Sequence, residues 1–342
     1  MAKIKVKPVQ IIVVAIIAVI AIALIVGDVI AYSYAPIISG FFGSNEQIGG
    51  DAAAIEEAAK SGDELVRKIG NEGVVLMKDE EGEDGKPTLP LPENEKKINI
   101  FGWGATDSGF LLAGNGSGRS YVHPDNKLTL LGAFEEAGFE YNQEIIDIYE
   151  DWCTDEDQDW GETANWNNRY NTKLKEPETD KAFPEGVVQR AKDHSDTALI
   201  VLSRYSGEYI GRIYDHQPKH DLPEDETRSF NEISTEEESL IKMCTANFEN
   251  VIVVFNTGSI MDMTFLDDPA FGDIDAAMNV GYMGQSGAAA IPAIISGKVN
   301  PSGKLADTIV YDPEVNEISR VNGWASDIVY AEDIYIGYKW YE

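Results

Sequence analysis

The chain has 342 residues, of which 59 are acidic and 27 are basic, so its formal net charge is −32 at pH 7. A surface this negative repels phosphate backbones and anionic lipid headgroups, which argues against a nucleic-acid partner. The charge suits a neutral substrate, because such a substrate needs no electrostatic steering; the alternative interpretation is that the charge simply keeps an exported protein soluble.

The first 32 residues have the pattern of a membrane anchor. Three lysines precede an unbroken apolar run from Ile11 to Val26, and apolar residues resume after Asp28. About 20 helical residues cross a bilayer core, and flanking basic residues stay on the cytoplasmic side. We therefore expect a single-pass anchor in the cell membrane with the main domain extracytoplasmic; a cleaved signal peptide is the alternative, and it also exports the chain. The predicted segments are a cytoplasmic basic tail at 1–8, a transmembrane anchor at 9–32 and a connector at 33–50.

From residue 51 onward, helix-like and strand-like segments alternate. Short apolar runs predict strands at 73–78, 98–103, 198–202, 251–255 and 274–280. Helical spacing predicts helices at 51–68, 128–137, 186–194, 234–247 and 286–295. Ser234 is a predicted N-cap, and Gly138 and Gly297 are predicted helix ends. Uninterrupted Val/Ile strands separated by helices indicate a mostly parallel sheet that is covered on both faces, with ligands at the carboxyl ends of its strands.

A candidate catalytic carboxylate follows the strand predicted at 198–202. In the loop at 203–209, Glu208 stands next to a glycine and near Tyr205 and Tyr209. Nearby aromatic rings partly desolvate a carboxyl, which raises its pKa toward the range of a general acid. A solvated loop glutamate is the alternative interpretation.

A second loop, after the strand predicted at 98–103, is rich in glycine. The glycines at 102–109 do not fit the GxGxxG pattern, and the chain has no GxxxxGK[ST] motif, so the sequence does not favour a nucleotide site. Trp103 and the glycines suit a sugar instead, because an indole face stacks on a sugar ring and close backbone amides bind hydroxyl groups.

The sequence predicts neither a metal nor a cofactor. Residues 155–166 resemble a calcium loop, but Trp166 takes the place of its bidentate glutamate. His216 and His220 are four residues apart, with a proline between them that disfavours the helix a zinc pair would need. Cys153 and Cys244 form no CxxC motif, and whether they pair is left open.

Five segments of the chain follow the order of one known family. They are Glu72–Lys78 with Leu89–Leu91, Ile98–Gly104 with Gly116–Gly118, Ser203–Glu208, Gly281–Gly287 with Gly297–Thr308, and Glu332–Tyr341. The fourth closely matches the pattern GKxNPSGKLPxT. Together these segments resemble glycoside hydrolase family 3, specifically the α/β-sandwich domain of its β-glucosidases. An anchor followed by this domain resembles the family's inverted, sandwich-first arrangement.

The resemblance implies a three-layer α/β sandwich with a mostly parallel sheet at residues 51–342, preceded by one transmembrane helix. It also implies that Glu208, which matches the glutamate of the family's SGE loop, is the general acid/base. Retaining hydrolysis needs a second carboxylate as nucleophile. In the family this is an aspartate on a (β/α)8 barrel, for which the chain has no remaining segment. We therefore expect the barrel in the same precursor or in a partner chain. The residues we expect to bind substrate are Trp103, Ser117, Arg119, Tyr209 and Arg212.

The expected activity is retaining, β-glucosidase-like hydrolysis of terminal β-linked sugars from oligosaccharides or glycosides. In this hypothesis the chain contributes the acid/base half of the site. A non-catalytic, membrane-anchored carbohydrate-binding or scaffold module is the alternative.

Overall fold

A computed structural model describes the chain at residues 8–9, 13, 16–27, 51–82, 85–114, 127–154, 176–206, 232–310, 333–335 and 337–339. The chain divides into two compact units, Met1–Ala59 and Lys60–Glu342. Among the described residues, no helix combines the length and the apolar character that crossing a bilayer requires. The anchor predicted at 9–32 lies partly outside the described residues, and it stays a prediction.

Six strands form one sheet in the order β1-β6-β5-β4-β2-β3. Their bounds are Val75–Asp79 (β1), Lys97–Phe101 (β2), Glu140–Tyr141 (β3), Thr197–Arg204 (β4), Asn250–Thr257 (β5) and Ala276–Asn279 (β6). The strands from β6 to β3 pair in parallel, whereas β1 pairs antiparallel with β6 at the edge. The two central strands, β4 and β5, align over their whole length, from Thr197 opposite Asn250 to Arg204 opposite Thr257. The carboxyl ends of the parallel strands therefore lie together along one edge of the sheet, the carboxyl edge, which runs across the strands and differs from the side edge formed by β1.

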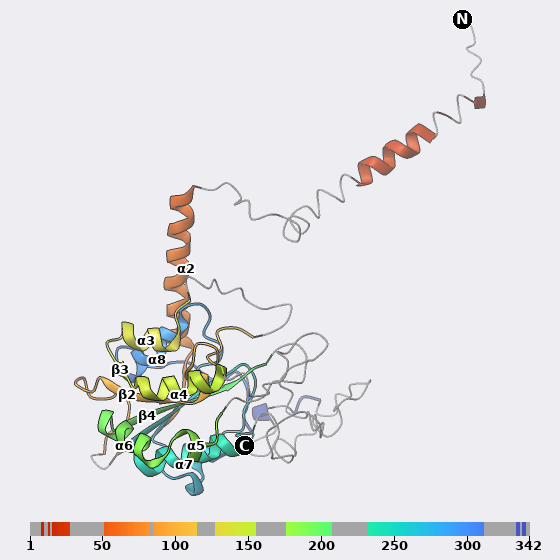
Figure 1. Ribbon diagram of the computed structural model, residues 1–342. Helices are drawn as coiled ribbons and strands as arrows, with labels where there is room; N and C mark the ends of the chain where they lie inside the picture. Colours follow the sequence, from red (N-terminus) through yellow and green to blue (C-terminus); the bar gives the residue numbers. More distant parts are fainter. Residues whose placement is uncertain are drawn as a thin grey trace, which may run out of the picture. The chain divides into compact units, whose positions relative to one another are not determined.

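Helices cover both faces of this sheet. The α-helices are Ala52–Gly73 (α2), Leu130–Glu136 (α3), Gln143–Thr154 (α4), Thr179–Ala182 (α5), Glu185–His194 (α6), Thr235–Asn247 (α7) and Ala290–Ile295 (α8). Short 3₁₀ helices lie at Trp103–Ala105 (η1), Thr264–Asp267 (η3), Pro269–Phe271 (η4), Gly287–Ala289 (η5) and Gly337–Lys339 (η7). Figure 1 shows α3 and α8 on one side of the sheet and α6 and α7 on the other.

The side chains of β4 show why the sheet has two cores. Successive residues of a strand point to opposite faces. Leu199 and Val201 accordingly join the cluster that contains Phe134 of α3, and Ile200 joins the one that contains Leu240 of α7. Every residue of β4 is buried, as expected for a central parallel strand. The predicted α/β sandwich with a mostly parallel sheet is therefore confirmed in the described residues.

Candidate functional site

The turn after β2 brings the predicted sugar-binding loop over the end of β4. Gly102 has a φ of 95°, a value that favours glycine. A Cβ there would lie 2.4 Å from the backbone oxygen of Val201, so no other residue fits without a shift of the chain. Trp103 follows directly and begins η1. The glycine thus allows close contact between the β2 and β4 ends.

A buried carboxyl group holds this turn in place. The backbone N–H of Trp103 donates to Glu176 Oε2 at 3.0 Å, and the hydroxyl of Tyr149 donates to Glu176 Oε1 at 2.7 Å. The backbone of Gly102 also forms a hydrogen bond with the hydroxyl of Tyr149. The pKa of Glu176 is raised to about 8: burial is the largest cause, the negative charges of Glu237 and Glu236 add to the rise, and the two hydrogen bonds offset part of it.

Glu176 has the perturbed pKa of a catalytic group but the surroundings of a structural one. Its exposed fraction is 5%, and both of its carboxyl oxygens already bind protein groups. A reacting carboxyl needs an open approach for its substrate. We therefore assign Glu176 to the support of the Trp103 turn and not to the chemistry.

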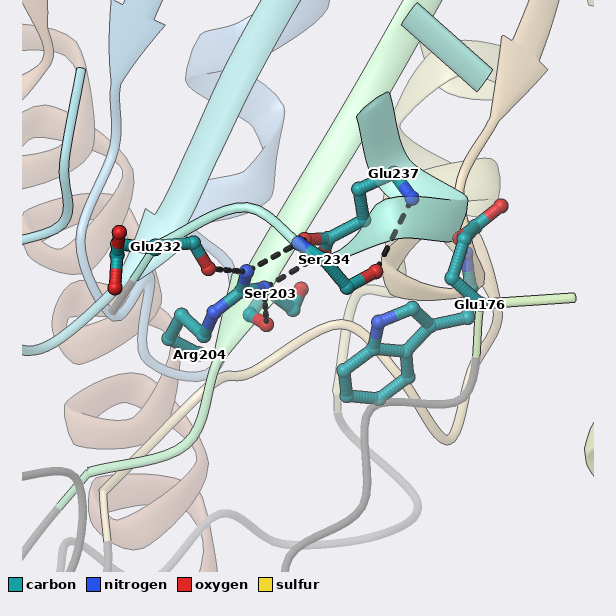
Figure 2. A network of polar contacts seen from close by, with 7 residues as sticks. Glu176, Ser203, Arg204, Glu232, Ser234 and Glu237 are labelled. Atoms are coloured by element: carbon teal, nitrogen blue, oxygen red, sulfur yellow. Dashed lines mark hydrogen bonds and ion pairs between the residues drawn. The ribbon is translucent and has the colours of Figure 1, made fainter. Parts of the chain in front are cut away.

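An ion pair joins the end of β4 to the start of α7 (Figure 2). Nη1 and Nη2 of Arg204 donate to the two carboxylate oxygens of Glu237 at 2.7 and 2.5 Å, and both side chains are fully buried. Nη2 also donates to the backbone oxygen of Glu232 at 2.8 Å. Glu237 completes a capping box with Ser234 at the N-terminus of α7. Arg204, the residue before the segment 205–231 that carries Glu208, is therefore tied to Glu232, the residue after it.

Asn256, at the end of β5, connects two loops and the end of β4 at the same edge. Its Oδ1 accepts from the backbone N–H of Leu111 at 2.6 Å and from the hydroxyl of Ser203 at 3.1 Å. Its Nδ2 donates to the backbone oxygens of Leu111 and Gly281, at 3.0 and 2.7 Å. An amide that is fully buried and uses all of its donor and acceptor positions is saturated, so Asn256 fixes the loops that follow β2 and β6 against the last residues of β4.

Of the six residues predicted for the site, only Trp103 lies in the described part of the chain. Its side chain is 8% exposed, and its indole N–H is buried with no hydrogen-bond partner among the described residues. The predicted acid/base and four predicted substrate-binding residues lie outside the described residues: Glu208, Ser117, Arg119, Tyr209 and Arg212. Their roles remain predictions.

The segments that carry these residues nevertheless start close together. The described chain stops at Gly114 before the segment with Ser117 and at Ser206 before the segment with Glu208. A Cβ on Gly114 would lie 3.0 Å from the backbone oxygen of Ser206, so the two starting points are in contact. The fold thus brings together the described starting residues of two loops that were predicted to share one site.

Metal chemistry has no geometric basis in the described residues. They contain no group of three or more His, Cys, Asp or Glu side chains arranged to hold a metal ion. Cys153 and Cys244 are both buried in the cluster between the sheet and α7. The calcium-like segment and His216 with His220 lie outside the described residues.

Known proteins share both the sequence pattern and this fold. A profile described as "Glycosyl hydrolase family 3 C-terminal domain" matches residues 74–338. The chain belongs to glycosyl hydrolase family 3. The predicted family is thereby confirmed, and the α/β sandwich is the C-terminal domain of that family.

The relatives of this family 3 chain include several β-glucosidases. It is 28% identical to a β-glucosidase of Ruminococcus albus, over 82% of this chain and 26% of the relative. It is 29% identical to β-glucosidase A of Butyrivibrio fibrisolvens, over 82% of this chain and 32% of the relative. The chain therefore spans about a quarter to a third of the length of these curated relatives.

Solved structures of β-glucosidases are similar to this chain in fold as well as in sequence. β-Glucosidase 3B from Thermotoga neapolitana, in complex with glycerol, matches with a TM-score of 0.64 and 30% identity, over 84% of this chain and 36% of that one. A β-glucosidase from Paenibacillus barengoltzii matches with a TM-score of 0.64 and 28% identity, over 81% of this chain and 27% of that one.

Proposed function

We propose that this chain supplies the acid/base half of a retaining, β-glucosidase-like active site. The main support is the position of the segment with Glu208. It follows β4 directly, at the sheet edge where ligands bind in parallel sheets, in a family whose relatives include β-glucosidases. The proposed substrate is an oligosaccharide or glycoside with a terminal β-linked sugar, a neutral molecule compatible with a net charge of −32.

In this proposal Glu208 first protonates the glycosidic oxygen as the bond to the anomeric carbon breaks. A second carboxylate attacks that carbon from the opposite face and forms a glycosyl-enzyme. Glu208 then takes a proton from water, which displaces the enzyme carboxylate and releases the sugar. The chemistry consists of proton transfers and two displacements, so it requires no cofactor.

The second carboxylate is proposed to come from a (β/α)8 barrel, either in the same precursor or in a partner chain. A retaining mechanism places the two carboxyl groups about 5–5.5 Å apart, so the barrel must face the carboxyl edge of the sheet. We further propose that Trp103, Ser117, Arg119 and Tyr209 contact the sugar from this side. Arg212 completes that set.

The anchor at 9–32 remains part of the proposal. It would hold the domain outside the cell membrane, where oligosaccharides are released from polymers. Protease treatment of intact cells that express the chain checks this, because an exported domain is digested from outside while a cytoplasmic marker is preserved.

Glu208→Gln, made in a barrel-containing assembly, tests the acid/base role. With an alkyl β-glucoside, whose leaving group needs protonation, we expect kcat/KM to fall by about 10²–10⁴-fold. A dinitrophenyl β-glucoside leaves without protonation, so the loss in its glycosylation step should be much smaller. Sugar binding should persist, because the variant keeps the shape of the side chain.

Glu140→Gln provides the matched control. Glu140 is an exposed carboxylate in β3, near the amino end of the neighbouring β2, away from the proposed site. We expect this variant to keep full activity on both substrates. Full activity of Glu208→Gln on the alkyl glucoside would exclude Glu208 as the acid/base, and sugar binding without turnover in the wild-type assembly would favour the carbohydrate-binding module.

A further inference from the structure

Tyr282 lies at the carboxyl edge, three residues after the end of β6. Its ring occupies a slot between two glycines. A Cβ on Gly258 would lie 2.3 Å from the ring carbon Cε2, and a Cβ on Gly114 would lie 2.7 Å from the same carbon. Any larger residue at either glycine would displace the ring, so the loops after β2 and β5 together set its position.

The hydroxyl group of Tyr282 binds every polar group of Ser206. The backbone N–H of Ser206 donates to Tyr282 Oη at 2.7 Å, and Oη donates to the backbone oxygen of Ser206 at 3.0 Å. The Ser206 hydroxyl lies 2.8 Å from the same Oη. A phenol has one donor and two acceptor sites, and this arrangement uses all three. One side chain therefore fixes the backbone of Ser206 on both sides of its Cα.

We propose that Tyr282 is a positioning residue for the acid/base carboxyl of Glu208; this rests on the function proposed above. Ser206 is the last described residue before that glutamate. Two peptide units span at most about 7 Å, so covalent geometry alone keeps the Cα of Glu208 within that distance of the Cα of Ser206. A fixed Ser206 thus limits the volume in which the carboxyl group can lie.

Such a limit matters because proton transfer depends on distance. A general acid must come within about 3 Å of the atom that it protonates, and a misplacement of 1 Å can cost about 10²-fold in rate. The bond from Arg204 to Glu232 joins the two residues that flank this segment, whereas Tyr282 holds Ser206, which is two residues closer to Glu208 than Arg204 is. Through Gly114, the same ring also borders the start of the segment with Ser117.

Tyr282→Phe removes the hydroxyl and leaves the ring in its slot. We first measure amide hydrogen exchange of the full 342-residue chain. The Ser206 amide loses its acceptor, so its exchange should accelerate by about tenfold, while amides in the centre of β5 should not change. Tyr141→Phe is the control, because the hydroxyl of Tyr141 binds the exposed Glu135. Equal exchange of the Ser206 amide in both variants would show that the Tyr282 hydroxyl does not hold the backbone of Ser206, and would overturn the proposal.

The second measurement uses a barrel-containing assembly and both glucosides. Tyr282→Phe should lower kcat by about tenfold on the alkyl glucoside, with KM little changed, and by much less on the dinitrophenyl glucoside. Equal losses on both substrates would mean a general structural defect and would overturn the positioning role. If Glu208→Gln stays active while Tyr282→Phe still accelerates Ser206 exchange, the proposed function fails. Only the contact between Tyr282 and Ser206 is then supported.

Discussion

At the scale of single residues, Glu176 makes the stability of the fold depend on pH. Its carboxyl group is fully surrounded by protein, between the turn at Trp103 and the hydroxyl of Tyr149. Cys244, Glu236 and Glu237 lie close enough to interact with Glu176 or Tyr149 electrostatically. The pKa of Glu176 rises from its usual 4.5 to about 8, so the folded chain keeps this proton at neutral pH and the unfolded chain does not.

This difference predicts a falling free energy of unfolding as the pH rises. Between about 4.5 and 8 the native state binds more protons, so the contribution of Glu176 is fully present below pH 4.5 and is lost as the pH rises through 8. The slope is at most about 1.4 kcal/mol per pH unit. Denaturant unfolding of Glu176→Gln from pH 5 to 8 should lack this slope.

The exposed Glu178, two residues further on, provides the control for that experiment. Glu178→Gln should follow the wild-type curve. If the curves of Glu176→Gln and the wild type run parallel across the whole range, the buried carboxyl does not carry the proton that we assign to it.

Sequence reasoning found the loops but not the residues that hold them. Gly114 and Ser206 border segments that the family pattern singles out, and Gly281 to Gly287 belongs to that pattern as well. Glu176 lies outside these segments, and Tyr282 lies inside one of them, but nothing local shows what either residue binds, because their partners are distant in the chain. Tyr282 binds a residue 76 positions away, and Glu176 binds one 73 positions away. Only the folded sheet reveals such contacts.

At the scale of elements, strong local signals predicted the structure well. Ser234 begins α7 as expected, because its capping box with Glu237 is a local pattern. Gly138 and Gly297 end helices with φ values of 83° and 72°. The helix predicted at 286–295 is instead a 3₁₀ turn followed by a shorter α8.

Several features at this scale escaped sequence analysis, among them the short β3 and α5, the longer α4 and the direction of β1. Helix α4 was not predicted, although Asn142 caps it and Ile145 and Tyr149 are buried at helical spacing. The antiparallel direction of β1 could not be predicted either. A strand has the same apolar pattern in both directions, so only the path of the chain decides how β1 meets β6.

The link between β4 and α7 predicts a large loss of stability for Arg204→Met. The variant leaves the carboxylate of Glu237 buried without its partner, which typically costs about 3–5 kcal/mol of unfolding free energy. Adding Glu237→Gln should recover part of that loss, because glutamine keeps the capping box and removes the buried charge. Denaturant unfolding of the single and double variants checks both statements.

The exposed pair of Arg190 and Glu144 is the matched control, since it has the same two-point geometry on the surface. Arg190→Met should lose far less stability than Arg204→Met, because water already solvates both charges. Equal losses in the two variants would show that burial gives the Arg204 pair no special importance.

At the scale of the whole molecule, the fold and the family could be predicted because five separate motifs occur in one order. The profile match at residues 74–338 confirms that reading. The same match explains why the activity is a proposal, since the relatives are three to four times longer than the aligned part of this chain. A retaining mechanism needs two carboxylates, and the proposed function assigns one of them, Glu208, to this chain.

The central claim is that this domain carries the acid/base and not the nucleophile. Its most direct test is the hydrolysis of an aryl β-glucoside by the purified 342-residue chain without a barrel domain, with Glu208→Gln measured beside it. We predict no turnover by either protein, because an acid alone cannot form the glycosyl-enzyme. Turnover that Glu208→Gln abolishes would contradict the account, because the domain would then carry a nucleophile of its own.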